Sequence, residues 1–265
     1  MTELKNTQQA KQLTVLLIGD SCIDEYCYGT VSRLSPEAPV PVLQFRSTTS
    51  NPGMAANVYK NLLAFGVEVD FMTNGEKIKK VRYVDVKSGQ NLLRTDYDVE
   101  LLPWSGYLAT SLDEYDAVVI SDYNKGFVTY EAIERIIKSA TCPVFIDTKK
   151  QDLSRFSADH VYVKINELEY RNRFSIPKNL VVTLGDRGAM LKQYNHEKIY
   201  STGSVEVMDV CGCGDTFLAA LSYQYLNTNS IEQAIDFANR CSAITVGHRG
   251  VYSLTRDDIA KVDTK

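Results

Sequence analysis

Short runs of apolar and β-branched residues alternate with helical patterns along this chain, and this alternation limits the possible folds more than any other feature. The runs that resemble strands buried on both faces are 13–18, 67–72, 117–120, 144–146, 160–163 and 180–183. Helical patterns occupy 53–65, 130–139 and 230–247, the last beginning with a capping box of Ser230 and Gln233. The order strand, helix, strand predicts an α/β fold with a mostly parallel sheet and helices on both faces.

Two segments, about 26–46 and 79–97, have strand-like patterns without helices between them. We expect them to form an antiparallel flap that lies as a lid over the carboxyl ends of the strands, where open α/β sheets bind ligands. The 265 residues, 44% of them hydrophobic, are enough to bury one large core. We therefore expect one domain spanning 1–265, with the two lid segments inserted in it.

Charge and hydropathy exclude several functions. The 29 basic and 33 acidic residues give a net charge of −4, which predicts no binding to nucleic acid or to an anionic membrane, although a local phosphate pocket stays open. The apolar runs are too short to span a bilayer and the polar N-terminus lacks the centre of a signal peptide, so we expect a cytoplasmic protein. The six cysteines show no zinc spacing, and most of them are expected to be small buried side chains.

The strongest chemical signal is segment 209–217, in which glycines lead directly into a helical pattern. Free backbone N–H groups from Gly212 to Asp215 would face an anion at the helix start. Asp215 is placed there to take a proton from a hydroxyl while the amides stabilise a transferring phosphoryl group. A plain glycine turn is the alternative, and the motif alone favours it. Because the chain has no P-loop, dinucleotide fingerprint or nucleophile elbow, phosphoryl transfer without a P-loop remains.

Other segments support this interpretation by their order: GDSCID at 19–24, SRLSPEAPVPV at 32–42, PGMAAN at 52–57, QNLLRTD at 90–96, SDYNKG at 121–126, IDTK at 146–149, NELE at 166–169 and TLGDRG at 183–188. With 209–217, they resemble the motifs of ribokinase (PfkB)-family sugar kinases, most of all the bacterial D-glycero-β-D-manno-heptose 7-phosphate kinases. The resemblance covers most of the chain. It implies a ribokinase-like three-layer α/β/α fold with a small β lid, and ATP-dependent phosphorylation of a sugar or sugar-phosphate hydroxyl.

The resemblance also implies residue roles. Asp215 corresponds to the catalytic base, and the amides of Gly212, Cys213 and Gly214 to the anion hole. The sugar-contacting positions are Asp24, Gly53 and Asn57. Asn166 and Glu169 correspond to the motif that organises Mg²⁺ and its waters. The nucleotide positions are Thr183, Gly185, Gly188, Asn239 and Gly250. ATP and Mg²⁺ are thus the expected cofactors, with a monovalent cation as a further candidate.

Each role has a structural alternative: turn caps for Asp24 and Asn57, a helix start for the Asn166 motif, and a hairpin for the glycines at 185 and 188. Arg33, Arg94 and Lys125 lie in heptose-kinase-like segments. They are candidates for binding the phosphate of a sugar phosphate, and the alternative for each is a solvated charge.

The chain departs from the pattern at several points. Met54 replaces the second glycine of the sugar-site pair, Cys213 replaces an alanine, and Lys164-Ile165 replaces Thr-Pro. The chain is also short near 74–79 and 173–180. A kinase for another sugar or nucleoside, or a non-catalytic sugar- or nucleotide-binding relative, are therefore kept as alternatives.

The lid predicts how the protein assembles. A flap of this size buries too little apolar surface to be stable alone. Its apolar side chains, Val31, Leu34, Val40, Val42, Phe45, Val81, Tyr83 and Val84, could form a core shared by two copies. We therefore expect a homodimer joined through the lids. A monomer whose lid folds onto its own sheet is the alternative.

Overall fold

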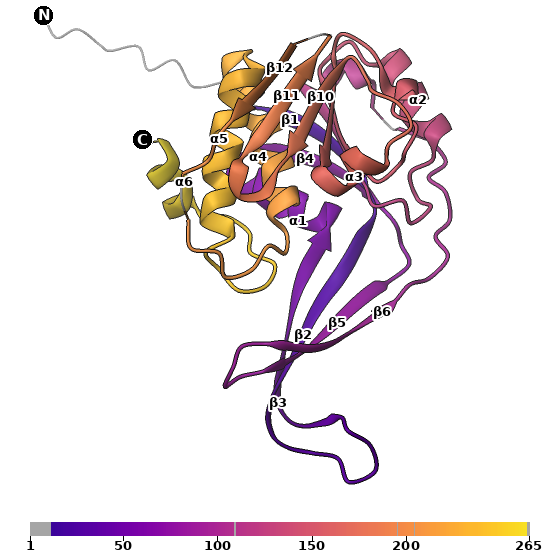
Figure 1. Cartoon of the computed structure of the whole chain (residues 1–265). Helices are drawn as coiled ribbons and strands as arrows, with labels where there is room; N and C mark the ends of the chain where they lie inside the picture. The colour runs from indigo at the N-terminus through magenta and orange to yellow at the C-terminus, as the bar shows by residue number, and fades with distance from the viewer. Residues whose placement is uncertain (1–11, 109, 195, 204, 264–265) are drawn as a thin grey trace, which may run out of the picture.

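The larger of two sheets has eight strands in the order β12-β11-β10-β9-β8-β7-β1-β4 (Figure 1). The computed structural model describes residues 12–108, 110–194, 196–203 and 205–263. Strands β4, β1, β7, β8, β9 and β10 run parallel, and β11 and β12 continue the sheet antiparallel. The strands are β1 Thr14–Gly19, β4 Glu68–Thr73, β7 Ala117–Asp122, β8 Val144–Thr148, β9 Val161–Asn166, β10 Asn179–Thr183, β11 Ala189–Gln193 and β12 His196–Tyr200.

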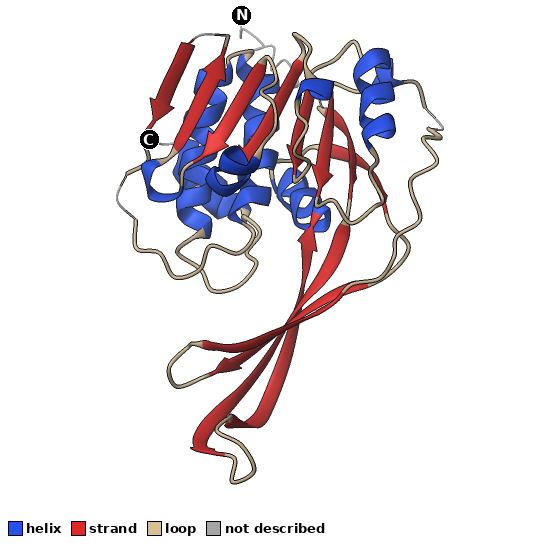
Figure 2. Ribbon diagram, turned by 45° about the vertical axis from the view of Figure 1, so that its right-hand side comes forward, coloured by secondary structure: helices blue, strands red, loops and turns tan. Residues whose placement is uncertain are grey.

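Helices cover both faces of this sheet (Figure 2). One apolar core joins the sheet to α1, α4, α5 and α6, and a second joins its other face to α2. The α-helices are α1 Ala55–Ala64, α2 Tyr130–Ser139, α3 Glu167–Asn172, α4 Cys213–Thr228, α5 Ile231–Thr245 and α6 Arg256–Asp263. Three short 3₁₀ turns are η1 Leu112–Glu114, η2 Ser154–Phe156 and η3 Gly185–Arg187. The predicted mostly parallel α/β fold is confirmed.

One predicted helix start and one predicted capping box need correction. The helix expected from residue 53 begins at Ala55, because Gly53 and Met54 still pair with Cys22 and Ser21 as the end of a strand. At α5, the Ser230 side chain accepts a hydrogen bond from the Gln233 backbone, as predicted. The reciprocal bond of a capping box is absent from the described contacts, and the Ser230 hydroxyl instead donates to Glu232.

The second sheet is the lid, with strand order β3-β2-β5-β6. Its strands are β2 Ser21–Leu34, β3 Pro41–Met54, β5 Ile78–Asp85 and β6 Asn91–Tyr97. The central pair, β2 and β5, is parallel, so the expectation of a wholly antiparallel flap was wrong. The reason is the connection, since β5 is reached only after α1 and β4 and so enters beside β2 in the same direction.

The lid projects from the carboxyl edge of the large sheet (Figures 1 and 2). Its apolar residues divide into two groups. Val81 and Val84, near the base, are buried within this chain, whereas Leu34, Val40 and Phe45 on the long β2–β3 hairpin are each more than half exposed. Within the described ranges, no helix combines the length and apolar character needed to cross a membrane.

Candidate active site

The loops that follow the parallel strands bring the predicted residues to one edge of the large sheet. Tyr123 follows β7, Lys149 follows β8, Asn166 ends β9 and Gly185 follows β10. A cavity of about 1140 Å³ opens there, and the start of α4 forms one of its walls. This is the edge at which an open α/β sheet binds ligands. We call the residues that line this cavity the cavity side of the site.

Asp215 lies in the first turn of α4 and is only 2% exposed. Both of its carboxylate oxygens accept hydrogen bonds, Oδ1 from the Tyr123 hydroxyl at 2.7 Å and Oδ2 from the Asn57 amide at 3.1 Å. Burial raises the pKa of Asp215 to about 6, although the two hydrogen bonds oppose this rise. A carboxyl group with a pKa near neutrality has the proton affinity required of a general base.

The turn before α4 presents fewer free amides than the sequence predicted. Gly212 takes a left-handed conformation, with φ of 79°, which a side chain rarely adopts. The Asp215 N–H donates to the Gly212 carbonyl at 3.1 Å, and the Cys213 N–H makes a long contact of 3.4 Å to Val210. In the described part of the chain, the N–H groups of Gly212 and Gly214 have no partner. An anion at this helix start would therefore meet two free amides, not four.

Two lysines line the cavity near this turn, the buried Lys164 and the exposed Lys149, and each is paired with a carboxylate. Lys164 Nζ lies 2.7 Å from Asp147 and 3.4 Å from the Gly214 carbonyl, and Lys149 Nζ lies 2.5 Å from Glu169. Burial alone would lower the pKa of Lys149, but the charges of Asp147 and Glu169 raise it. Burial raises the pKa of Asp147 against the opposing effect of Lys164. The positive charges on the cavity side are thus balanced by this chain.

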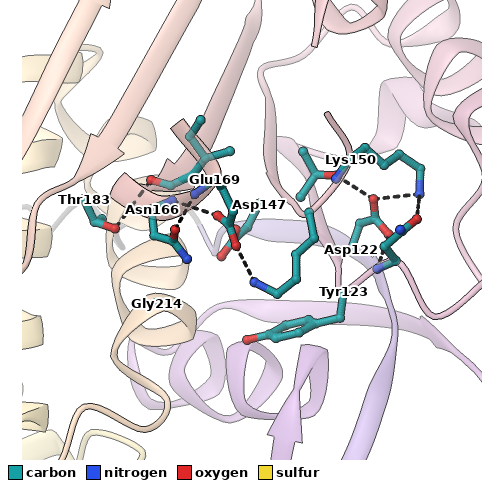
Figure 3. Close-up of polar contacts among 12 residues, drawn as sticks. Asp122, Tyr123, Asp147, Lys150, Asn166, Glu169, Thr183 and Gly214 are labelled. Atoms are coloured by element: carbon teal, nitrogen blue, oxygen red, sulfur yellow. Dashed lines mark hydrogen bonds and ion pairs between the residues drawn. The ribbon is translucent and has the colours of Figure 1, made fainter. Parts of the chain in front are cut away.

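Asn166 and Glu169 form a complete capping box at the start of α3, with both hydrogen bonds at 2.8 Å (Figure 3). The helix-start alternative for this motif is therefore present. Among the described residues, no three acidic, histidine or cysteine side chains converge as metal ligands. Both residues line the cavity, but their side-chain oxygens already accept hydrogen bonds within the chain. They therefore fit a Mg²⁺ ion that keeps most of its waters and takes its other ligands from phosphates.

Four of the five predicted nucleotide positions, Thr183, Gly185, Gly188 and Asn239, line the large cavity. Gly185 and Gly188 also form the turn of the β10–β11 hairpin, as their structural alternative predicted. Gly250 does not line this cavity. It donates to Asp209 and lines a second cavity, of about 390 Å³, between the lid and residues 208–209 and 249–250.

The base of the lid faces Asp215 from the other direction, and we call it the lid side of the site. Asp24 is 4% exposed and pairs with Arg82 at 2.5 Å. A side chain on Gly53 would collide with the Asp24 carboxylate, so glycine is required for this close approach. Asn57 is fully buried and contacts Asp215, so neither it nor Asp24 serves as a turn cap.

The three predicted phosphate-binding cations are not brought together. Arg33 is exposed near the far end of the β2–β3 hairpin. Arg94, on β6 and cross-strand from Arg82, pairs with its neighbour Asp96, and Lys125 pairs with Asp98. These contacts leave the sugar-phosphate role of all three as a prediction.

Sequence reasoning missed Lys80 on β5. It is 9% exposed, and its Nζ lies 5.3 Å from the centre of the Tyr123 ring. No carboxylate of the described chain forms an ion pair with it, although Asp96 is its cross-strand neighbour. Lys80 and Arg82 alternate on β5 with Lys79 and Val81, and this period of two was the signal that could have identified them.

Met54 has φ of 58° and ψ of −134°, a conformation that essentially only glycine adopts without strain. It joins β3 directly to α1, between the Gly53 that touches Asp24 and the Asn57 that touches Asp215. Its side chain is 3% exposed and packs in the core with Cys22 and Ile78. Met54, which replaces a glycine of the family motif, is therefore a strained residue at the junction of the lid and the core.

The chain resembles known proteins in sequence. Residues 105–258, more than half of the chain, match the model described as pfkB family carbohydrate kinase. "Bifunctional protein HldE" of a Nitratiruptor species is 30% identical over 303 residues, covering 94% of this chain and 64% of that protein. The protein of the same name from Helicobacter pylori is 29% identical over 307 residues, covering 94% and 66%. The chain thus spans about two thirds of the length of these relatives.

Solved structures show the same fold. Ribokinase from Thermotoga maritima has a TM-score of 0.71 at 17% identity, covering 96% of this chain and all of that one. Phosphofructokinase-2 from Escherichia coli, in a complex with potassium, has a TM-score of 0.69 at 15% identity, covering 96% and 98%. At these identities the structures establish the ribokinase-like fold, and the family model establishes the membership. The chain, with its carboxylate at a glycine-led helix start, belongs to the pfkB family of carbohydrate kinases.

Proposed function

We propose that this kinase transfers the γ-phosphoryl group of ATP to a hydroxyl of a sugar phosphate, with heptose 7-phosphate as the model acceptor. The observation that carries the proposal is Asp215, a buried carboxylate with a pKa of about 6 beside the free amides of Gly212 and Gly214. The heptose-kinase-like segments and the HldE relatives support the choice of acceptor.

The reaction is an in-line displacement. Asp215 takes the proton of the acceptor hydroxyl as its oxygen forms a bond to the γ-phosphorus, and the bond from that phosphorus to the bridging oxygen breaks to release ADP. The amides of Gly212 and Gly214 stabilise the charge on the transferring group. Lys164 lies 3.4 Å from the Gly214 carbonyl and, paired with Asp147, fixes the position of this turn.

Asn166 and Glu169 are the residues proposed to hold Mg²⁺ through its waters. When bound, this ion neutralises charge on the phosphates of ATP. Lys149 is paired with Glu169 and balances that carboxylate in the free enzyme. A monovalent cation stays a candidate, supported by the potassium complex of the Escherichia coli phosphofructokinase-2.

Lys80 supports an acceptor that already carries a phosphate. A lysine that is nine-tenths buried is normally paired with an anion, because an isolated buried charge is costly. Lys80 lacks such a partner within the described residues and faces Tyr123, which contacts Asp215. An acceptor phosphate on the lid side would supply the missing anion, and Arg82 lies two residues along the same strand face.

We also propose that two copies join through their lids. Leu34, Val40 and Phe45 expose large apolar side chains on a hairpin that extends away from the core (Figure 1). Light scattering should give twice the 29.7 kDa mass of one chain, and Phe45→Asp should return the mass to that of a monomer. A fully active wild-type monomer would reject the dimer without affecting the proposed reaction.

The proposed reaction is tested by measuring ADP release from Mg·ATP with a panel of acceptors: heptose 7-phosphate, other sugar phosphates, the matching neutral sugars, and nucleosides. We expect the greatest stimulation from a sugar phosphate. Stimulation by neutral sugars or nucleosides alone would refute the acceptor and leave the kinase reaction. Binding of sugars without any ADP release would favour the non-catalytic alternative.

A further inference from the structure

The catalytic carboxylate of the proposed mechanism is inaccessible in the free enzyme. Asp215 is 2% exposed, and each of its oxygens already accepts a hydrogen bond. An acceptor hydroxyl must nevertheless come within about 3 Å of one of these oxygens to give up its proton. Each oxygen could accept a further hydrogen bond, but the carboxylate is almost fully covered, so an acceptor hydroxyl can reach it only if a covering group such as Tyr123 or Asn57 moves aside.

The contact between Asn57 and Asp215 is held in place by several further hydrogen bonds of the Asn57 side chain. This side chain is fully buried on α1, and its amide also lies 3.3 Å from the Gly212 carbonyl. Its side-chain oxygen Oδ1 accepts hydrogen bonds from Ser253 at 2.9 Å and from Asn61 at 3.2 Å. Moving Asn57 would break all of these contacts at once.

The Tyr123 contact is built differently. Its backbone is fixed, since its N–H donates to the buried Asp20 at 2.8 Å and the adjacent Asp122 is held by Thr148 and Lys150 (Figure 3). Its side chain lines the large cavity, and the hydroxyl has Asp215 as its hydrogen-bond partner. Rotation of this side chain would break that hydrogen bond and the ring contacts with Lys80 and Lys149, and it would uncover the carboxylate.

We propose that Tyr123 is a positioning residue. Its hydroxyl donates a hydrogen bond to the catalytic carboxylate in the free enzyme, and the acceptor hydroxyl replaces it there when the acceptor binds. This inference rests on the proposed function, in which Asp215 is the base. The exchange replaces one O–H donor by another at Oδ1, so the carboxylate keeps two hydrogen bonds throughout. It also keeps water away from the base until an acceptor arrives.

Two lysines hold the ring of Tyr123 at the boundary between the two sides of the site. Lys80 Nζ, on the lid, lies 5.3 Å from the ring centre, and Lys149 Nζ, after β8, lies 4.9 Å from it. Cations at such distances attract an aromatic ring. An acceptor phosphate that binds Lys80 would weaken that attraction, so binding of the acceptor and rotation of Tyr123 are coupled.

The exchange has a signature in the pH dependence. The Tyr123 hydroxyl lowers the pKa of Asp215, so Tyr123→Phe should raise this pKa in the free enzyme. In the complex with acceptor, the acceptor hydroxyl has already replaced Tyr123, and the substitution should not change the pKa there. The other titratable groups around the carboxylate are Asp147, Lys164, Lys149, Cys22 and Cys213, which the substitution leaves in place.

The test compares Tyr123→Phe with wild type in two pH profiles. The profile of kcat/KM reports the free enzyme, and that of kcat reports the complex. We expect the acid limb of kcat/KM to move upward by about 0.5–1 pH unit and that of kcat to stay. Ionisation of the substrate itself affects the profiles of both enzymes equally, so it does not change the difference between them. Movement of both limbs would mean that Tyr123 stays on the base, and movement of neither would mean that it does not touch the working base; either result overturns the proposal.

The control is Tyr115→Phe, which removes a buried hydroxyl 2.6 Å from Asp70 outside the site and should move neither limb. A second readout needs no turnover. The carboxyl ¹³C shift of Asp215, assigned by its loss in Asp215→Asn, should titrate near pH 6 in wild type and higher in Tyr123→Phe. A higher pKa of Asp215 in Tyr123→Phe, with no ADP release from the wild-type enzyme, would refute the proposed function but support the contact between Tyr123 and Asp215. An unchanged NMR pKa in an active enzyme would refute the inference alone.

Discussion

The two sides of the site differ in how their charges are balanced. On the cavity side, Lys164 is neutralised by Asp147 and Lys149 by Glu169. On the lid side, Arg82 is neutralised by Asp24, whereas Lys80 forms no ion pair with a carboxylate of the described chain, although its charge helps to lower the pKa of Asp96. The lysines of the cavity side are thus already paired with carboxylates of the described chain. Under the proposed function, the phosphate of the acceptor supplies the anion that pairs with Lys80 on the lid side.

Asp215 stands where the two sides meet, and its removal should have the largest effect. Asp215→Asn keeps the shape of the side chain but not its ability to take a proton. We expect kcat to fall by about 10²–10⁴-fold, while the affinity for ATP and the fold are retained. Steady-state kinetics and ATP titration measure this, with the exposed Asp236→Asn as control. Wild-type turnover in folded Asp215→Asn would remove the mechanism on which the comparison depends.

Breaking the balance on the cavity side should cost stability. Lys164→Met leaves Asp147 buried without its partner, and we expect the free energy of unfolding to fall by about 3 kcal/mol. The double variant with Asp147→Asn should recover part of this loss, because no charge then remains buried alone. Urea denaturation measures both. If Lys164→Met is as stable as wild type, the cavity side is not balanced in the way described.

On the lid side, the same kind of substitution should act on the acceptor and not on the fold. Lys80→Met removes the unpaired cation, and we expect KM for a sugar phosphate to rise by about 10–100-fold, the effect of one charged hydrogen bond. The KM for ATP and the unfolding midpoint should change little. Lys79→Met, next in sequence but paired with Glu25, is the matched control. Equal effects of the two substitutions would contradict the assignment.

The smallest predicted effect concerns the junction between the two sides. Met54→Gly and Met54→Ala both delete the buried side chain, but only glycine relieves the backbone at φ of 58°. We expect the glycine variant to be the more stable of the two by about 1 kcal/mol, the reverse of the usual order at a helix start. Thermal unfolding of both variants measures the difference. A more stable alanine variant would show that the conformation carries no strain.

The comparison of the two sides also explains what the sequence could predict. The buried runs such as 117–120 and 180–183 determined the large sheet, and the parallel order then placed Asn166, Gly185 and Gly188 at one edge. These residues follow their strands directly, so local motifs located them. The candidate roles of ATP and magnesium at this edge remain predictions.

The lid side was harder to predict because its residues are joined by strand pairing. Lys80 lies beside Asp24 only because β5 runs parallel to β2, and the expected antiparallel flap gave a different set of neighbours. Arg33 was selected from a distinctive segment, yet it lies on the exposed hairpin far from the base of the lid. Tyr123 was missed as a contact of Asp215, since no pattern in the sequence relates residues 92 positions apart.

The most direct measurement of the central claim is the affinity of the free protein for a sugar and for its phosphate, measured by isothermal titration calorimetry at low and high salt. Heptose with heptose 7-phosphate, and mannose with mannose 6-phosphate, are suitable pairs. We predict that the phosphorylated member binds at least about 10-fold more tightly at low salt, that added salt narrows the difference, and that Lys80→Met removes it. Equal affinities, or tighter binding of the neutral sugar, would contradict the claim that the lid side awaits an anion.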